Sequence, residues 1–180
     1  MRNTQSHKIA LCGVLGALSV ALLLMGNLLQ IGTYAAPMLA AFLLIPILEE
    51  YGRRYAFMLY LTVSILSVLL VPDLELSLFY LFVVGYYPIL RTALERIRLR
   101  PVRWIAKFAW FNAAVVIMYL LLIFVLAPPE LAAEFAADGA PMLVLLLAMG
   151  NLSFWFCDRA LVSMTVLYRR RLRSKLKKMF

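Results

Sequence analysis

The sequence predicts an all-α polytopic membrane protein: one compact bundle of six transmembrane helices with both termini in the cytoplasm. Three observations support this prediction. The 180 residues are 65% hydrophobic and 15% charged, against roughly 45–50% and 25% in soluble domains. Several windows of about 20 residues carry no charge, and this length suffices to span a bilayer as a helix. The 18 Lys and Arg residues all fall on one side of the predicted helices.

This composition excludes a soluble enzyme, a secreted disulfide-rich domain and a disordered tail protein. Cys12 and Cys157 lie in separate apolar segments, so the sequence predicts neither a disulfide framework nor a metal site. His7 is the one histidine, which argues against a histidine-based catalytic triad. There is no glycine-rich phosphate loop and no internal repeat, and no soluble domain can be separated within residues 1–180.

Six apolar segments are expected to form the spans, in the order 9–31, 34–48, 55–71, 76–90, 105–127 and 141–168. A helix rises 1.5 Å per residue, so a hydrocarbon core of roughly 30 Å requires about 20 residues. The second and fourth segments are shorter than this, and we expect them to gain length from their flanks. The sixth is long enough to extend into the headgroups before the basic C-terminal tail.

The connections between these segments differ sharply in charge. All Lys and Arg residues lie in the N-terminal segment, the turn 49–54, the stretch 91–107 and the tail from 159 onwards. The opposite connections contain no Lys or Arg, and their charged residues are all acidic: Asp73, Glu75, Glu130, Glu134 and Asp138. The positive-inside rule places the basic side in the cytoplasm, and two cytoplasmic termini require an even number of spans. The net charge of +9 is therefore attributed to anchoring near anionic lipid, and no nucleic acid partner is expected.

A cleavable signal peptide is the competing interpretation of the N-terminus, since Arg2 and Lys8 precede an apolar run. That run, of about 23 residues, exceeds the usual 7–15 of a signal peptide. We therefore expect the first segment to remain as a helix.

Small residues recur every fourth position in the first segment, at Gly13, Ala17 and Ala21. This spacing places them on one stripe of a helix, where another helix can approach closely. The stripe predicts either a contact inside the bundle or a docking face for a separate membrane subunit.

Polar residues inside the apolar segments are candidates for contacting a solute, because hydrocarbon offers them no partners. Asn27 and Gln30 lie near the outer end of the first segment, where they either line a pocket or cap the interface. Asn151 lies near the membrane midplane in the last segment, with Trp155 on the same face. Asp158, on that face too, is expected to form a structural ion pair, with Arg159, Lys107 or Arg54 as possible partners.

These features resemble the S components of energy-coupling-factor (ECF) transporters, small six-helix proteins that capture vitamins and other micronutrients in bacteria. The resemblance covers nearly the whole chain. It rests on size, six spans with both termini inside, the small-residue stripe, and a last segment that carries Gly150-Asn151 and Asp158 before a basic tail. No motif identifies the solute.

In that family the stripe of helix 1 faces a transmembrane coupling subunit, and the first loop and helices 4–6 hold the solute near the outer face. The resemblance therefore implies docking roles for Gly13, Ala17 and Ala21. It implies a substrate-binding set of Asn27, Gln30, Tyr34, Tyr80, Tyr119, Asn151 and Trp155. It also implies a bacterial plasma-membrane protein without catalytic residues, cofactor or metal, which passes a small solute to a coupling subunit with two cytoplasmic ATPases.

Three alternatives remain open. A non-catalytic scaffold, such as a cell-shape or envelope-assembly component, would need no outward polar pocket, so dispersal of Asn27, Gln30 and Asn151 onto separate faces would favour it. An enzyme acting on lipid or isoprenoid groups would need clustered acids, histidines or a nucleophile. A secondary transporter would show inverted repeats, and the sequence has no convincing three-plus-three similarity.

Overall fold

The computed structural model describes residues 2–29, 34–122 and 139–172, and every regular element within these ranges is helical. In chain order the elements are α1 (Arg2–Leu29), α2 (Ala35–Phe42), α3 (Leu44–Glu50), α4 (Arg53–Leu70), α5 (Leu74–Phe79), the π-helical segment η1 (Tyr80–Val84), α6 (Tyr87–Leu94), α7 (Arg100–Leu121), α9 (Gly139–Leu167) and the π-helical segment η3 (Tyr168–Leu172).

Helices within the described ranges are long and apolar enough to cross a membrane. Four such stretches are Lys8–Leu29, Arg53–Leu70, Leu74–Leu94 and Arg100–Leu121. Large apolar side chains on these helices point outward, including Leu28 at 79% exposure. A soluble protein rarely exposes so many large apolar side chains, so the structure agrees with the predicted membrane-protein class.

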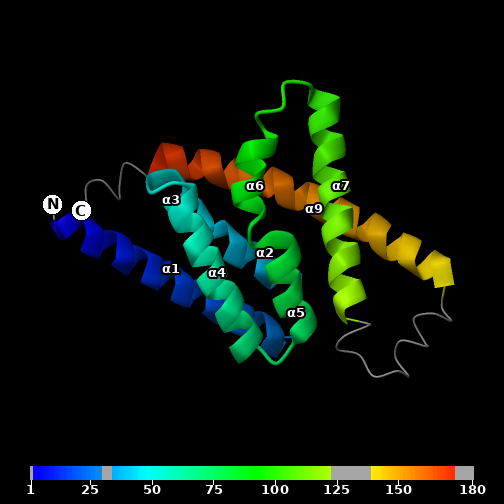
Figure 1. The fold of residues 1–180 in the computed structure, drawn as a ribbon, viewed down its shortest axis with the longest axis horizontal. Helices are drawn as coiled ribbons and strands as arrows, with labels where there is room; N and C mark the ends of the chain where they lie inside the picture. The colour runs from blue at the N-terminus through cyan, green and yellow to red at the C-terminus, as the bar shows by residue number, and fades with distance from the viewer. Residues whose placement is uncertain (1, 30–33, 123–138, 173–180) are drawn as a thin grey trace.

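The helices run alternately between two ends of the molecule (Figure 1). The start of α1, the α3–α4 turn, the α6–α7 connection and the last turns of α9 share one end. We call it the basic end because these segments and the helical turns next to them carry the Lys and Arg residues of the described ranges. The other end contains the α4–α5 connection with its acids Asp73 and Glu75, and we call it the acidic end.

The predicted second span is two short helices rather than one. The chain breaks at Leu43, between α2 and α3, where the Leu43 amide donates to the Ala40 carbonyl three residues earlier, at 3.2 Å. Pro46 explains the break, because it has no amide to donate to the carbonyl four residues before it, that of Phe42.

The predicted fourth span is also interrupted, and together with its flanks it runs from Leu74 through Leu94. The Gly85 amide donates to the Tyr80 carbonyl at 2.8 Å, a five-residue step that leaves the Leu81 carbonyl free. The Tyr60 hydroxyl donates to that carbonyl at 2.7 Å. A Cβ atom at Gly85 would lie 2.9 Å from the Tyr60 ring and 2.6 Å from the Tyr80 carbonyl oxygen, so only glycine fits.

Two faces of α1 have different surroundings. Gly16 packs against α4, since a Cβ atom there would lie 3.1 Å from Leu59 Cδ1. Gly13, Ala17 and Ala21 lie on the exposed side, and a Cβ atom at Gly13 would meet no heavy atom within 4 Å. The stripe therefore lies on an exposed face of α1, which leaves it accessible to another membrane helix.

Candidate functional site

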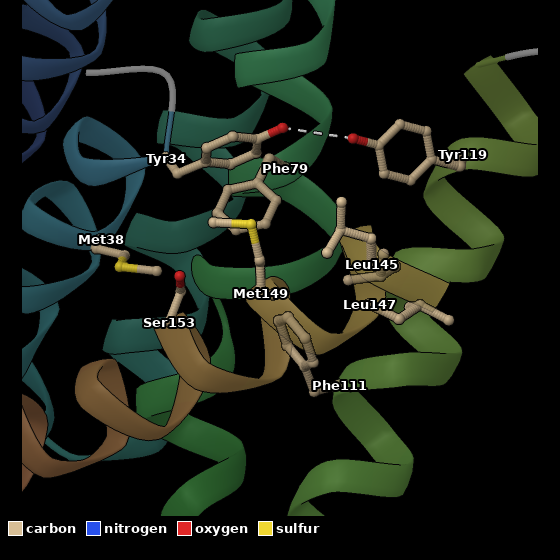
Figure 2. Close-up of a pocket in the computed structure, with 11 residues that line it drawn as sticks. Tyr34, Met38, Phe79, Phe111, Tyr119, Leu145, Leu147, Met149 and Ser153 are labelled. Carbon is tan, nitrogen blue, oxygen red and sulfur yellow. Dashed lines mark hydrogen bonds between the residues drawn. The ribbon is translucent and has the colours of Figure 1, made fainter. Parts of the chain in front are cut away.

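A cavity of about 320 Å³ lies toward the acidic end, between α2, α5, α7 and α9 (Figure 2). Its volume is at the lower end of the roughly 300–1,000 Å³ range of small-molecule sites. Most of its wall is apolar. The lining residues are Tyr34, Met38, Phe79, Phe111, Val115, Tyr119, Leu145, Leu147, Met149, Gly150 and Ser153.

Two tyrosines and a glutamate form the polar edge of this cavity. The hydroxyls of Tyr34 and Tyr119 point toward each other, with their oxygens 3.4 Å apart (Figure 2). Both donate to the same oxygen of Glu75, Tyr34 to Oε1 at 2.8 Å and Tyr119 to Oε1 at 2.9 Å. The three side chains come from the start of α2, from α7 and from the first turn of α5. They therefore connect three helices at the cavity edge.

Local structure explains why Glu75 lies there. The Asp73 carboxylate accepts from the Leu76 amide at 3.2 Å and caps α5, which begins at Leu74. Glu75 is thus in the first helical turn, where the helix dipole favours a negative charge. The ring of Phe79, one turn later, makes a T-shaped contact with the Tyr34 ring, with centroids 5.1 Å apart, and this contact helps to fix the tyrosine.

Aromatic rings separate the cavity from the basic end. Phe111, in the cavity wall, stacks on Phe154 with ring centroids 4.5 Å apart. Phe154 in turn contacts the Tyr87 ring at 4.9 Å. Because these side chains are buried, a solute in the cavity would rest on a closed aromatic floor.

A buried ionic cluster lies beneath that floor and joins α6, α7 and α9. Asp158 accepts from Lys107 Nζ at 2.8 Å on both carboxylate oxygens and from the Tyr87 hydroxyl at 2.6 Å, and Arg91 Nε lies 3.4 Å from Oδ1. Arg91 also pairs with Glu95. The buried Asp158 carboxylate thus faces two cations, one of which it shares with the exposed Glu95, so its charge is compensated as a buried charge requires. The structure selects Lys107 from the three expected partners and adds Arg91.

A second cavity, of about 290 Å³, lies near the basic end between α3, α6 and α9. Its charged residues are already paired: Arg91 with Glu95, and Arg169 with Glu49 through two contacts of 2.8 Å. The Glu49 carboxylate raises the pKa of the Arg169 guanidinium. Because these charged groups already bind one another, they are not available to a solute, and the first cavity is the better candidate for a solute site.

The predicted solute-binding residues divide into two groups. Tyr34 and Tyr119 meet at the cavity edge. Asn151 instead pairs with Asn112 of α7: Asn151 Nδ2 donates to Asn112 Oδ1 at 2.9 Å, and Asn112 Nδ2 donates to Asn151 Oδ1 at 3.1 Å. Asn151 Nδ2 also donates to the Leu147 carbonyl at 2.7 Å. The amide that hydrocarbon would penalise therefore finds its partners inside the bundle.

The other predicted residues lie outside the cavity wall formed by the described residues. Tyr80 is fully buried, with its ring 6.3 Å from that of Tyr60. Trp155 faces outward, with the Arg159 guanidinium 5.5 Å from its ring centroid. Asn27 is half-buried on the last turn of α1, and Gln30 lies outside the described residues. Asn27 and Asn151 therefore do not converge.

The amide pair gives a stability prediction. Replacing Asn151 with leucine leaves the Asn112 Oδ1 oxygen without its donor, although Asn112 Nδ2 still donates to the Phe108 carbonyl. We expect the protein to lose about 1 kcal/mol of stability, within the range measured for interhelical hydrogen bonds in membranes. The Asn112→Leu/Asn151→Leu double variant is expected to recover most of this loss, because both polar groups are removed. Thermal unfolding of the purified chain in detergent would measure both changes; equal stability of the two variants would contradict the pairing.

Sequence reasoning missed Glu75, Asn112 and most apolar residues of the cavity. Glu75 was recognised as an acid in an outer connection, but only the fold brings it to two tyrosines that are 41 and 44 residues away in sequence. Asn112 had a usable signal, since it is a lone amide in the apolar run of α7. Met38, Phe79 and Phe111 had none, because residues of these types occur throughout the chain.

Comparison with known proteins adds no assignment: no family model, curated protein or solved structure matches the chain.

Within the ranges that the structure describes, no group of three His, Cys, Asp or Glu side chains is placed to hold a metal ion. An enzyme acting on lipid groups would need clustered acids, but Glu49, Glu50 and Asp158 contact different partners, which are Arg169, the Tyr168 hydroxyl at 3.4 Å and Lys107 respectively. The geometry of the cavity is therefore the basis for a functional conclusion.

Proposed function

We propose that this protein is a solute-capture subunit of a bacterial plasma membrane importer, of the kind represented by the S components of ECF transporters. The observation that carries the proposal is the cavity at the acidic end, with an apolar wall and the Tyr34–Glu75–Tyr119 edge. A site with a mostly apolar wall and a few convergent polar groups is typical of small-molecule binding. The solute would be a vitamin or similar micronutrient.

The orientation follows from charge. Six helical passes, with α2–α3 and α5–α6 each serving as one interrupted pass, would place both termini in the cytoplasm, because the basic end carries the Lys and Arg residues. The cavity would then lie in the outer half of the membrane. A capture subunit requires this arrangement, since its solute arrives from outside. Energy would come from a transmembrane coupling subunit with two cytoplasmic ATPases.

The exposed stripe of α1 would be the docking face for that coupling subunit. Replacing Gly13 with leucine should reduce association with a co-expressed coupling subunit by at least about tenfold, because the side chain would separate the two helix backbones. It should leave solute binding unchanged, since the glycine has open space around it. Co-purification measures the first effect and solute binding the second. Leu18→Ala, at an exposed α1 position outside the stripe, is the control, and normal assembly of Gly13→Leu would rule out the docking role.

Mass spectrometry tests the capture function directly. The purified chain, extracted in detergent, should carry a specific small molecule in a fixed ratio to protein. Release should follow denaturation, and a control membrane protein prepared from the same cells should lack the molecule. Absence of any such molecule, combined with no stabilisation by a panel of micronutrients, would refute capture.

A membrane scaffold is the second candidate. One observation favours it: Asn27 lies at the end of α1, Asn151 is paired inside the bundle, and neither lines the cavity. A scaffold would retain its cellular role when the cavity is filled, whereas a capture subunit would lose its solute. The cavity-filling variant described in the Discussion therefore distinguishes the two.

A further inference from the structure

We propose that the cavity selects a small apolar solute that carries a protonated amine, with the amine held at the Tyr34–Glu75–Tyr119 edge. This inference rests on the proposed capture function and specifies the chemical class of the solute. Three independent features of the cavity carry it: the hydrogen-bonding capacity of its edge, the distribution of charge around it, and the nature of its wall.

The hydrogen bonds of the edge leave acceptors and no donors. A tyrosine has a single hydroxyl proton, and both Tyr34 and Tyr119 direct it to Glu75 Oε1. The ionised carboxylate has no proton to donate and retains Oε2 for another partner. What remains available to a solute is therefore a set of lone pairs on two phenol oxygens and one carboxylate. An ammonium group, with three N–H donors, matches this set, whereas a carboxylate or a phosphate does not.

Charge points to the same conclusion. The segments 9–52, 55–90 and 108–158 contain every residue of the cavity and its edge, and none of the three contains a Lys or Arg residue. The nearest cation along α7 is Lys107, which lies beyond the Phe111–Phe154 stack and is paired with Asp158. Nothing in these segments neutralises Glu75, so a cationic solute would supply the missing charge. An anionic solute would meet a carboxylate with no compensating group.

The wall of the cavity defines the rest of the molecule. Phe79 and Phe111 present aromatic surfaces, and Met38 and Met149 supply flexible, polarisable thioethers (Figure 2). Ser153 is the one hydroxyl among the lining residues away from the edge. An apolar, preferably aromatic body of modest size fits this wall, and the cavity of about 320 Å³ does not fit a large polar cofactor.

Three probes with one indole ring and different head groups test the inference: tryptamine, tryptophol and indole-3-acetate, which are cationic, neutral and anionic at pH 7. Their affinities for the purified chain in nanodiscs would be measured by isothermal titration calorimetry. Tryptamine is expected to bind at least about tenfold more tightly than tryptophol, because a hydrogen bond between an ammonium group and a carboxylate is stronger than one between neutral groups. Indole-3-acetate is expected to bind more weakly than tryptophol.

Two variants make the test specific. Glu75→Gln retains an acceptor for both tyrosines but removes the charge, so it should weaken tryptamine binding by about tenfold and change tryptophol binding by less than about twofold. Asp73→Asn removes a charge from the same connection, retains a side chain able to cap α5, and should leave both affinities unchanged. Thermal unfolding without probe verifies that both variants fold.

The outcomes separate the two levels of the proposal. Equal or tighter binding of tryptophol or indole-3-acetate would overturn the amine preference and leave solute capture standing. An equal loss of tryptamine binding in Asp73→Asn would overturn the specific role of Glu75. Failure of all three probes to bind would overturn the amine assignment, and the search for a co-purifying molecule would then decide separately whether the cavity captures any solute.

Discussion

Replacing Lys107 with methionine is expected to destabilise the protein by about 3 kcal/mol, because removal of one partner leaves a buried charge only partly compensated. Lys107 and Asp158 are 3% and 2% exposed, so water cannot replace the lost ammonium group. Arg91 and the Tyr87 hydroxyl remain beside Asp158, but Arg91 is shared with Glu95. The measurement is thermal or denaturant unfolding of the detergent-solubilised protein.

Arg169→Met is the matched control, since it also replaces a cation in an ion pair with methionine. The Arg169 side chain is 61% exposed, so loss of its pair with Glu49 should cost less than about 1 kcal/mol. The double variant Lys107→Met/Asp158→Asn should recover part of the loss, because it removes the orphaned charge. If Lys107→Met were no less stable than Arg169→Met, the buried cluster would not be what holds α6, α7 and α9 together.

The helical class of the protein could be predicted because it depends on composition and on the position of charges, which are local properties. The pairing of charged side chains could be predicted only in part, as Asp158 and Lys107 illustrate. A carboxylate in an apolar segment must find a cation, so an ion pair was predictable, and the fold then selected Lys107 over Arg54 and Arg159. Arg91 was not among the expected partners, because it lies just beyond the predicted segment 76–90, in the part of α6 that continues through Leu94.

The details of the cavity could not be predicted for a related reason. Asn151 was chosen because an amide near the midplane needs a partner, and a solute is only one way to satisfy it. Asn112, one helix away, is another. A single sequence gives the need for a hydrogen bond but not its partner, since the partner depends on how α7 crosses α9. Tyr34 and Tyr119, by contrast, line the cavity, where both donate to Glu75, a residue that sequence reasoning did not select.

Filling the cavity gives the most direct test of its role. Ser153→Trp places an indole ring in the cavity, beside Met38 (Figure 2), and should weaken solute binding by at least about a hundredfold. This factor corresponds to about 2.7 kcal/mol, or the burial of roughly 110 Å² of apolar surface, which a solute excluded from the cavity would lose. The amount of the co-purifying molecule per protein is the readout.

Leu152→Trp is the control because it adds the same ring one residue away, at a side chain that is 58% exposed and does not line the cavity. It should retain the solute at the level of the unaltered protein. Both variants should insert and unfold normally, since Ser153 and Leu152 are exposed on α9. If Ser153→Trp retained its solute, binding would have to occur elsewhere. A different result would favour the scaffold function: neither the unaltered protein nor Ser153→Trp carries a solute, and Ser153→Trp keeps the cellular role. A scaffold depends on outer surfaces, and this substitution leaves them intact.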